Sequence, residues 1–101
     1  MKLVPKSIKV PCLGSTEHES DPIVLIKLFH PFSSWTWYVT EYSPSEDLCF
    51  GLIDGHEVEL GYFSLDELKE LKIRGLGVER DLHWKPMSLS TLKKLLKAHS
   101  I

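Results

Sequence analysis

The sequence predicts an α+β fold, in which an antiparallel sheet of about four to five strands is packed on one face by two or three short helices. Three observations favour this class. Segments with strand character recur between residues 23 and 63, the connections between them are too short for parallel crossovers, and leucine-rich helical patterns follow. A chain of 101 residues is expected to form a single domain, residues 1–101.

The first part of the chain contains a short helical pattern, a polar loop and one apolar strand. Residues 4–10 are expected to form one or two helical turns, which Pro11 ends. Residues 14–22 are rich in Ser, Thr, Glu, His and Asp, which predicts a solvated, flexible loop. Residues 23–29 are nearly all apolar and several are β-branched, which predicts a strand.

Residues 35–42 alternate clearly, and their two faces are predicted to differ. One face carries Trp35, Trp37, Val39 and Glu41, and the other carries Thr36, Tyr38, Thr40 and Tyr42. The two tryptophans are expected to anchor the core. Tyr38 and Tyr42 are then expected to form an amphipathic surface of the kind enriched in protein interfaces, provided that no helix covers that side.

A hairpin is predicted next. Residues 48–53 and 57–63 both read as strands, and Asp54-Gly55 between them favours a tight turn in which Gly55 takes a positive φ. The alternation in the second strand puts Val58, Leu60 and Tyr62 on one face and Glu57, Glu59 and Gly61 on the other.

Two helices and a weak strand complete the prediction. Ser64 and Glu67 have the spacing of a capping box, which predicts a helix that carries Leu65, Leu68 and Leu71 inward until residues 74–77 break it. Residues 78–84 are expected to form an edge strand, which Pro86 ends. The last helix is expected over about residues 90–98, and its inward side chains are Leu89, Leu92, Leu95 and Leu96.

Composition places the chain among ordinary globular domains. Hydrophobic residues make up 43% and charged residues 26%, and no apolar run approaches the length of about 20 residues that a membrane helix needs. The N-terminus lacks the apolar stretch of a secretory signal, and two cysteines, Cys12 and Cys49, form no disulfide framework. A cytoplasmic protein with two passive cysteines and no cofactor is expected.

The net charge of −2 hides an uneven distribution. Residues 41–81 contain 11 acidic and 4 basic residues, a net charge of −7, whereas residues 82–101 carry +4. One interpretation is that these charges only solubilise the surface. The other is an acidic surface that attracts a basic protein partner, for which the candidate residues are Tyr38, Tyr42, Glu57, Glu59, Asp66, Glu67 and Glu70.

Two alternative sites stay open at this point. A basic C-terminal helix could contact the phosphates of a nucleic acid, with Lys85, Lys93, Lys94 and Lys97 as the candidate residues. In an extended segment Glu79, Asp81 and His83 share a face, where they could bind a metal ion in a small hydrolase or form a salt-bridged edge strand. No nucleophile or phosphate-binding motif is present, so a non-enzymatic protein is expected.

The sequence also resembles a bacterial family of about 100 residues classed as a domain of unknown function. The resemblance extends over roughly residues 4–92, and it is carried by the runs WTWYVTE at 35–41, FGL at 50–52, EVELGYFSL at 57–65 and ERD at 79–81. It implies a gene of a mobile element, such as a plasmid, an integrative element or a phage. The sharpest function that this setting implies is inhibition of a host defence nuclease, of the restriction or CRISPR kind.

Overall fold

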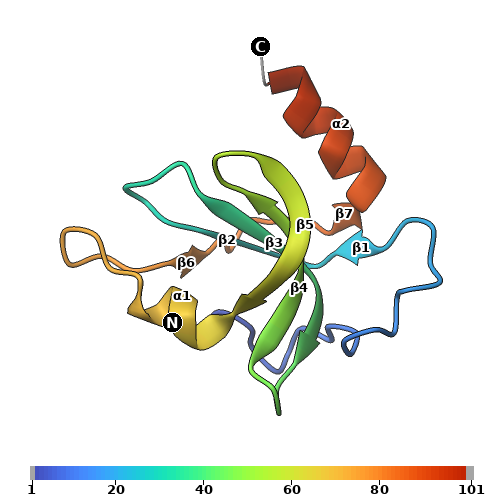
Figure 1. The fold of residues 1–101 in the computed structure, drawn as a ribbon, viewed down its shortest axis with the longest axis horizontal. Coiled ribbons are helices and arrows are strands. Elements are labelled where there is room, and N and C mark those ends of the chain that lie inside the picture. Colours follow the sequence, from blue (N-terminus) through green and yellow to red (C-terminus); the bar gives the residue numbers. More distant parts are fainter. Residues whose placement is uncertain (1, 100–101) are drawn as a thin grey trace.

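The computed structural model describes residues 2–99 and shows one five-stranded antiparallel sheet (Figure 1). The strand order is β5-β4-β3-β2-β6, so the predicted antiparallel sheet of four to five strands is confirmed. The bounds are Ile26–Phe29 for β2, Thr36–Ser43 for β3, Leu48–Asp54 for β4, Val58–Ser64 for β5 and Glu79–Arg80 for β6.

The apolar segment 23–29 does not form one continuous strand. Its first two residues form β1 (Ile23–Val24), which pairs with β7 (Met87–Ser88) in a separate two-stranded sheet. Leu25 connects β1 to β2, and its N–H donates to the carbonyl of Val39 at 3.1 Å. The chain therefore passes from the small sheet into the large one without leaving the hydrogen-bonded network.

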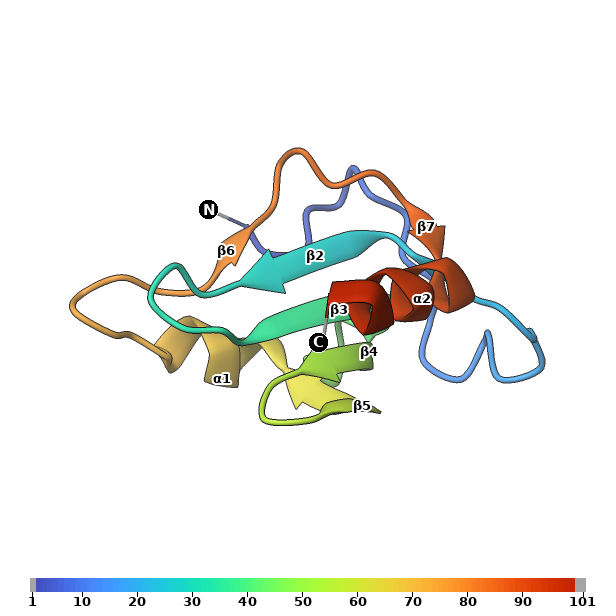
Figure 2. The same ribbon diagram turned by 90° about the horizontal axis from the view of Figure 1, so that it is seen from above.

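The two helices lie on opposite faces of the large sheet. α1 (Leu65–Glu70) adds Leu65 and Leu68 to a core cluster that contains Trp37, and α2 (Leu89–His99) adds Leu89 and Leu92 to a cluster that contains Tyr38. We call the two sides of the sheet the α1 face and the α2 face; Figure 2 shows the helices beside the twisted sheet. The prediction that two or three helices cover one face is wrong, because the central strands carry apolar side chains on both faces and both must be covered.

Several predicted helical segments are shorter than expected. Residues 4–10 form only one turn, closed by the hydrogen bond from the Ile8 N–H to the Pro5 carbonyl, although Leu3 beside it is buried in the α1-face core. α1 ends at Glu70, and its C-cap Leu71 is extended and exposed. The helix thus ends before the predicted break at residues 74–77, where the chain reverses with positive φ at both Arg74 and Gly75.

The hairpin between β4 and β5 exists, but its turn differs from the prediction. Asp54 pairs with Val58, so residues 55–57 form the loop, and Gly55 does not adopt a positive φ. A side chain at Gly55 would instead meet Trp35, since an ideal Cβ would lie 2.4 Å from the indole ring. Glycine is required there for the close approach of the ring.

A β-bulge changes the alternation of β3. Val39 pairs with Gly51 but Glu41 pairs with Phe50, so Thr40 is an extra residue in the strand. The bulge moves Glu41 to the α2 face, where it borders the same hollow as Phe50, and moves Tyr42 to the core of the α1 face. The predicted faces are therefore right up to Val39 and wrong after it.

α2 agrees with the predicted C-terminal helix to within a residue at each end. Leu89 and Leu92 are buried and Leu96 is half-buried, as expected, but Leu95 is 44% exposed and does not face the core. Asp21 fixes the start of the helix by accepting hydrogen bonds from the N–H and the hydroxyl of Ser90, at 2.8 and 2.6 Å. These bonds hold the pKa of Asp21 below its ordinary value.

Candidate binding surface

The most exposed apolar side chains of the sheet lie on its edge strand, β5. Val58, Leu60 and Tyr62 are 50%, 45% and 63% exposed, although they alternate regularly along the strand. They lie on the α2 face, since Tyr62 contacts the ring of Phe50 there with a centroid distance of 4.9 Å. A row of three large apolar side chains on an edge strand is unusual for a surface that meets only water.

The opposite side of β5 is acidic. Glu59 in the strand and Glu57, the last residue of the loop before it, alternate with the apolar row and are both exposed. The next position on that side is Gly61, whose ideal Cβ would lie 3.4 Å from the side chain of Ile53, a residue packed against the α1-face core. The two carboxylates therefore project on the α1 face, while the apolar row projects on the α2 face.

Between the apolar row and α2 the surface is hollowed. One groove of about 430 Å³ is lined by Leu52, Val58, Glu59, Leu60, Lys93, Leu96 and Lys97. A second, of about 350 Å³, lies between the end of β5 and the 14–22 loop, and Leu60 and Lys93 line both. Together they form a hollow along β5 that we call the β5 groove.

Glu41 anchors the loop that forms the far wall of the β5 groove. Its side chain is only 4% exposed, and it accepts hydrogen bonds from the N–H groups of Gly14 and Thr16, each at 2.8 Å, and from the Thr16 hydroxyl. Burial alone would raise the pKa of Glu41, but these three donors outweigh burial and hold its pKa below the ordinary value. The carboxylate is thus fully engaged in holding the wall.

The remaining predicted acidic residues lie on α1, the element that directly follows β5. Asp66, Glu67 and Glu70 are all exposed. The Ser64 hydroxyl accepts the Glu67 N–H at 3.4 Å, which confirms Ser64 as the N-cap. Asp47 reinforces this end by accepting the Ser64 hydroxyl and the Asp66 N–H, at 2.8 and 2.9 Å. Although burial would raise the pKa of Asp47, these bonds lower it.

The structure does not bring the two candidate tyrosines to one surface. Tyr38 is only 5% exposed and packs under Trp84, with a ring distance of 5.6 Å. Tyr42 lies half-buried on the α1 face, where the bulge has placed it. Burial raises the pKa of both phenols. The predicted tyrosine surface is therefore wrong, and the apolar side chains of β5 are the exposed ones.

The candidate lysines come from two segments. Lys85 is exposed in the loop before β7, and three exposed lysines lie on α2. Lys93 and Lys97, one helical turn apart, line the β5 groove, whereas the positive charge of Lys94 acts on Asp21. The four side chains do not form one row.

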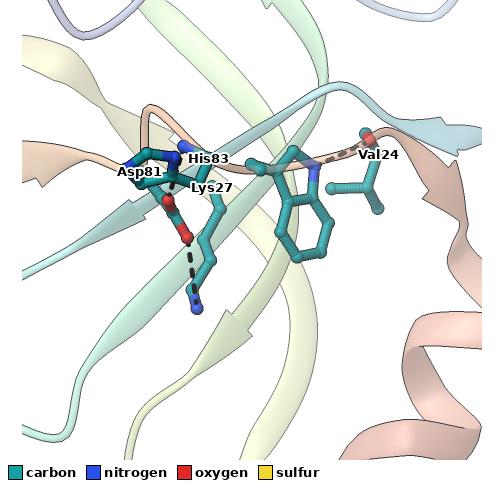
Figure 3. Close-up of polar contacts among 5 residues, drawn as sticks. Val24, Lys27, Asp81 and His83 are labelled. Carbon is teal, nitrogen blue, oxygen red and sulfur yellow. Dashed lines mark hydrogen bonds and ion pairs between the residues drawn. The ribbon is translucent and has the colours of Figure 1, made fainter.

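Glu79, Asp81 and His83 border a hollow of about 310 Å³. Figure 3 shows Asp81 and His83 beside Lys27. The Asp81 carboxylate accepts the His83 backbone N–H at 2.9 Å and lies 3.7 Å from the Lys27 ammonium, a cation that opposes a metal ion at the same oxygens. Within residues 2–99, no three His, Cys, Asp or Glu side chains form a group that could hold a metal ion. Of the two interpretations of this segment, the ion pair between Asp81 and Lys27 favours the salt-bridged one over the metal site.

The two cysteines differ in surroundings. Cys49 is completely buried in the α1-face core, and burial, aided by the nearby charge of Asp47, raises its pKa to about 12. Cys12 is exposed. A thiol with so high a pKa stays protonated and is a poor nucleophile, as expected for a cysteine of the core.

The sequence does not predict the β5 groove, although the alternation of apolar and acidic residues in β5 is plain in it. The pattern Glu57-Val58-Glu59-Leu60 indicates a strand with two different faces. It does not indicate that, among the described residues, the strand pairs with a neighbour on one side only. This edge position leaves the apolar row exposed.

In the described part of the chain, no helix has the length and apolar character needed to cross a membrane. No curated protein and no solved structure matches the sequence. Residues 8–100 do match a family, described as "Protein of unknown function (DUF2958)", which confirms the resemblance to a family of unknown function. Because the match spans nearly the whole sequence, the chain belongs to this family.

Proposed function

We propose that this protein is a non-enzymatic binding protein whose partner docks on β5 and its flanks. The observation that carries the proposal is the composition of the edge strand and the loop before it, where the exposed apolar row Val58, Leu60 and Tyr62 alternates with Glu59 and with Glu57, the last residue of the loop. Apolar side chains supply the area that a partner buries, and adjacent carboxylates steer a basic partner toward it.

The acidic residues of α1 extend the same charge. Asp66, Glu67 and Glu70 follow β5 directly in the chain and are exposed, so five of the eleven acidic residues of 41–81 lie between positions 57 and 70. A partner lined by Lys and Arg is the natural complement. Nucleases carry such surfaces because they must neutralise phosphates.

The sharpest form of the proposal is therefore an inhibitor of a host defence nuclease, of the restriction or CRISPR kind, encoded by a mobile genetic element and acting in the cytoplasm. Carboxylates on a rigid sheet edge compete with nucleic acid for the basic channel of the enzyme. This form rests on the implied genomic setting as well as on the charge.

The test is affinity capture from a host extract with the wild-type protein and two variants. Glu57→Lys combined with Glu59→Lys should abolish retention of the partner, and wild-type binding should weaken between about 0.05 M and about 0.5 M salt. The control is Glu46→Lys, an exposed carboxylate in the β3–β4 turn, which should leave retention unchanged. Retention of the same proteins by all three forms would contradict the proposal.

A second candidate function, a nucleic-acid-binding accessory, is favoured by the exposure of Lys85, Lys93, Lys94 and Lys97. It predicts a gel shift of an oligonucleotide at low salt, lost in the Lys93→Glu, Lys97→Glu double variant. No shift at micromolar protein would eliminate it.

A further inference from the structure

From the edge of the sheet we infer that the partner contributes an extended segment that pairs with β5 as a sixth strand, with basic and apolar side chains in alternation. The inference rests on the proposed binding function and specifies how the partner is held. It follows from three features of β5: its free edge, its two unlike faces and the position of α2.

The free edge supplies the backbone contacts. β5 has seven residues and pairs only with β4 among the described residues, so alternate N–H and C=O groups point away from the sheet. The opposite edge of the sheet is β6, which has only two residues. β5 is thus the one edge in the described fold long enough to template a further strand.

The two faces of β5 determine which side chains fit. A sixth strand places every second side chain on the α2 face, beside Val58, Leu60 and Tyr62, where apolar groups continue the floor of the β5 groove. Its other side chains lie on the α1 face, where a Lys or Arg near the start of β5 finds the opposite charge of Glu59 and of Glu57 just before the strand.

The position of α2 disfavours the reverse arrangement, although Glu59 also lines part of the groove. Lys93 and Lys97 both line the β5 groove, and Lys93 borders both of its parts, so a cationic side chain on the α2 face would meet like charge beside Lys93. Their aliphatic stems also extend the apolar wall made by Leu96. The basic residues of the incoming strand are therefore expected to project on the α1 face and the apolar residues on the α2 face.

The same charges disfavour a second copy of this chain at the edge. Antiparallel pairing of two β5 strands keeps the same face of both sheets on one side, which would gather Glu57 and Glu59 of both copies on a single face. Such a pair offers no cation to these carboxylates, whereas a basic strand neutralises them.

The probe is a blocked peptide of about eight residues, long enough to span β5, in which lysine and valine alternate. It is titrated into the ¹⁵N-labelled protein, and amide hydrogen exchange is measured with and without the peptide. Strand addition predicts slower exchange at alternate amides of β5. It also predicts at least about tenfold weaker binding for a peptide of the same composition with lysines and valines in two blocks, and for a peptide N-methylated along one edge.

A matched pair of variants tests the groove. The two leucines Leu60 and Leu95 are matched in exposure, at 45% and 44%, but only Leu60 lines the groove. Leu60→Lys should therefore weaken peptide binding at least about tenfold, whereas Leu95→Lys should leave it unchanged. Circular dichroism and thermal unfolding confirm that both variants fold.

Any of four results would overturn the inference, and the first three concern the peptide and the oligomeric state. They are equal binding of the alternating and block peptides, binding without slower exchange at β5, and a dimer in which β5 is already protected without peptide. Binding of an oligonucleotide in the groove instead of the peptide would also overturn it. If the peptide fails while Glu57→Lys with Glu59→Lys still abolishes partner capture, the binding function stands and only strand addition is wrong.

Discussion

The carbonyl oxygen of Tyr38 occupies the space that a side chain at Gly51 would need, since an ideal Cβ on Gly51 would lie 1.7 Å from it. Gly51 pairs with Val39 at the point where β3 bulges. Because the bulge turns Glu41 toward the 14–22 loop, this contact between two central strands positions one wall of the β5 groove.

Gly51→Ala is therefore expected to destabilise the protein by more than about 3 kcal/mol, since backbone must move to relieve the clash. Its cross-strand partner Gly61 provides the control, because a Cβ there would meet only the Ile53 side chain at 3.4 Å. Urea denaturation measures both variants. Similar stability of Gly51→Ala and Gly61→Ala would contradict the assigned contact.

Glu41→Gln should lower stability at neutral pH by about 1.5–3 kcal/mol, because a charged acceptor of three hydrogen bonds is lost. The pKa of Glu41 is lower in the folded state than in the unfolded state, so its contribution is complete above the unfolded pKa of about 4.3 and is lost as the pH falls through the folded pKa. The difference between wild type and variant should thus shrink as the pH falls through the folded pKa of Glu41.

Urea denaturation across this pH range checks the Glu41 prediction. Glu46→Gln, at an exposed turn position, should cost little at any pH. A wild-type advantage over Glu41→Gln that stays constant down to acid pH would show that the charge of the carboxylate is not what holds the loop.

The two cysteines should react at very different rates. With a pKa of about 12 and no exposure, Cys49 should not react with a disulfide reagent at mildly alkaline pH until the protein unfolds, whereas exposed Cys12 should react at once. Cys12→Ser should abolish the fast phase of the reaction between the native protein and the disulfide reagent. Two fast thiols in the native protein would mean that the α1-face core opens readily.

Removal of the helix cap at Ser64 should have a moderate effect. Ser64→Ala deletes the acceptor for the Glu67 N–H and the donor to Asp47, and should cost about 1 kcal/mol. Ser64→Thr keeps the hydroxyl and should be close to wild type in thermal unfolding. An equal loss of stability in Ser64→Ala and Ser64→Thr would show that side-chain packing, and not the helix cap, is responsible.

The sequence predicts this fold well wherever the cause is local. The alternation of Val58 to Tyr62 and the cap at Ser64 depend on neighbouring residues, and both are confirmed. The face of Tyr42 depends on a bulge fixed by the close approach of Gly51 to Tyr38, which no local pattern reveals. Likewise, two leucine-rich helices are recognisable, but the face each one covers depends on how the chain passes around the sheet.

The candidate site was predictable in charge and not in shape. The exposure of Glu57, Glu59 and the acidic residues of α1 follows from their polarity. The sequence predicts Tyr38 and Tyr42 as the apolar half of the surface. It does not show that Trp84 covers Tyr38, or that the bulge turns Tyr42 to the α1 face. In the structure the exposed apolar area comes instead from the side chains of the edge strand β5.

The most direct measurement of the central claim is hydrogen exchange of the protein alone and in complex with the partner captured from the host. Docking on the β5 groove predicts that exchange slows in residues 58–64 and in the turns of α2 that carry Lys93 and Lys97, while the β2–β6 edge is unchanged. Slower exchange confined to the β2–β6 edge or to the 4–10 turn, with β5 unaffected, would contradict it.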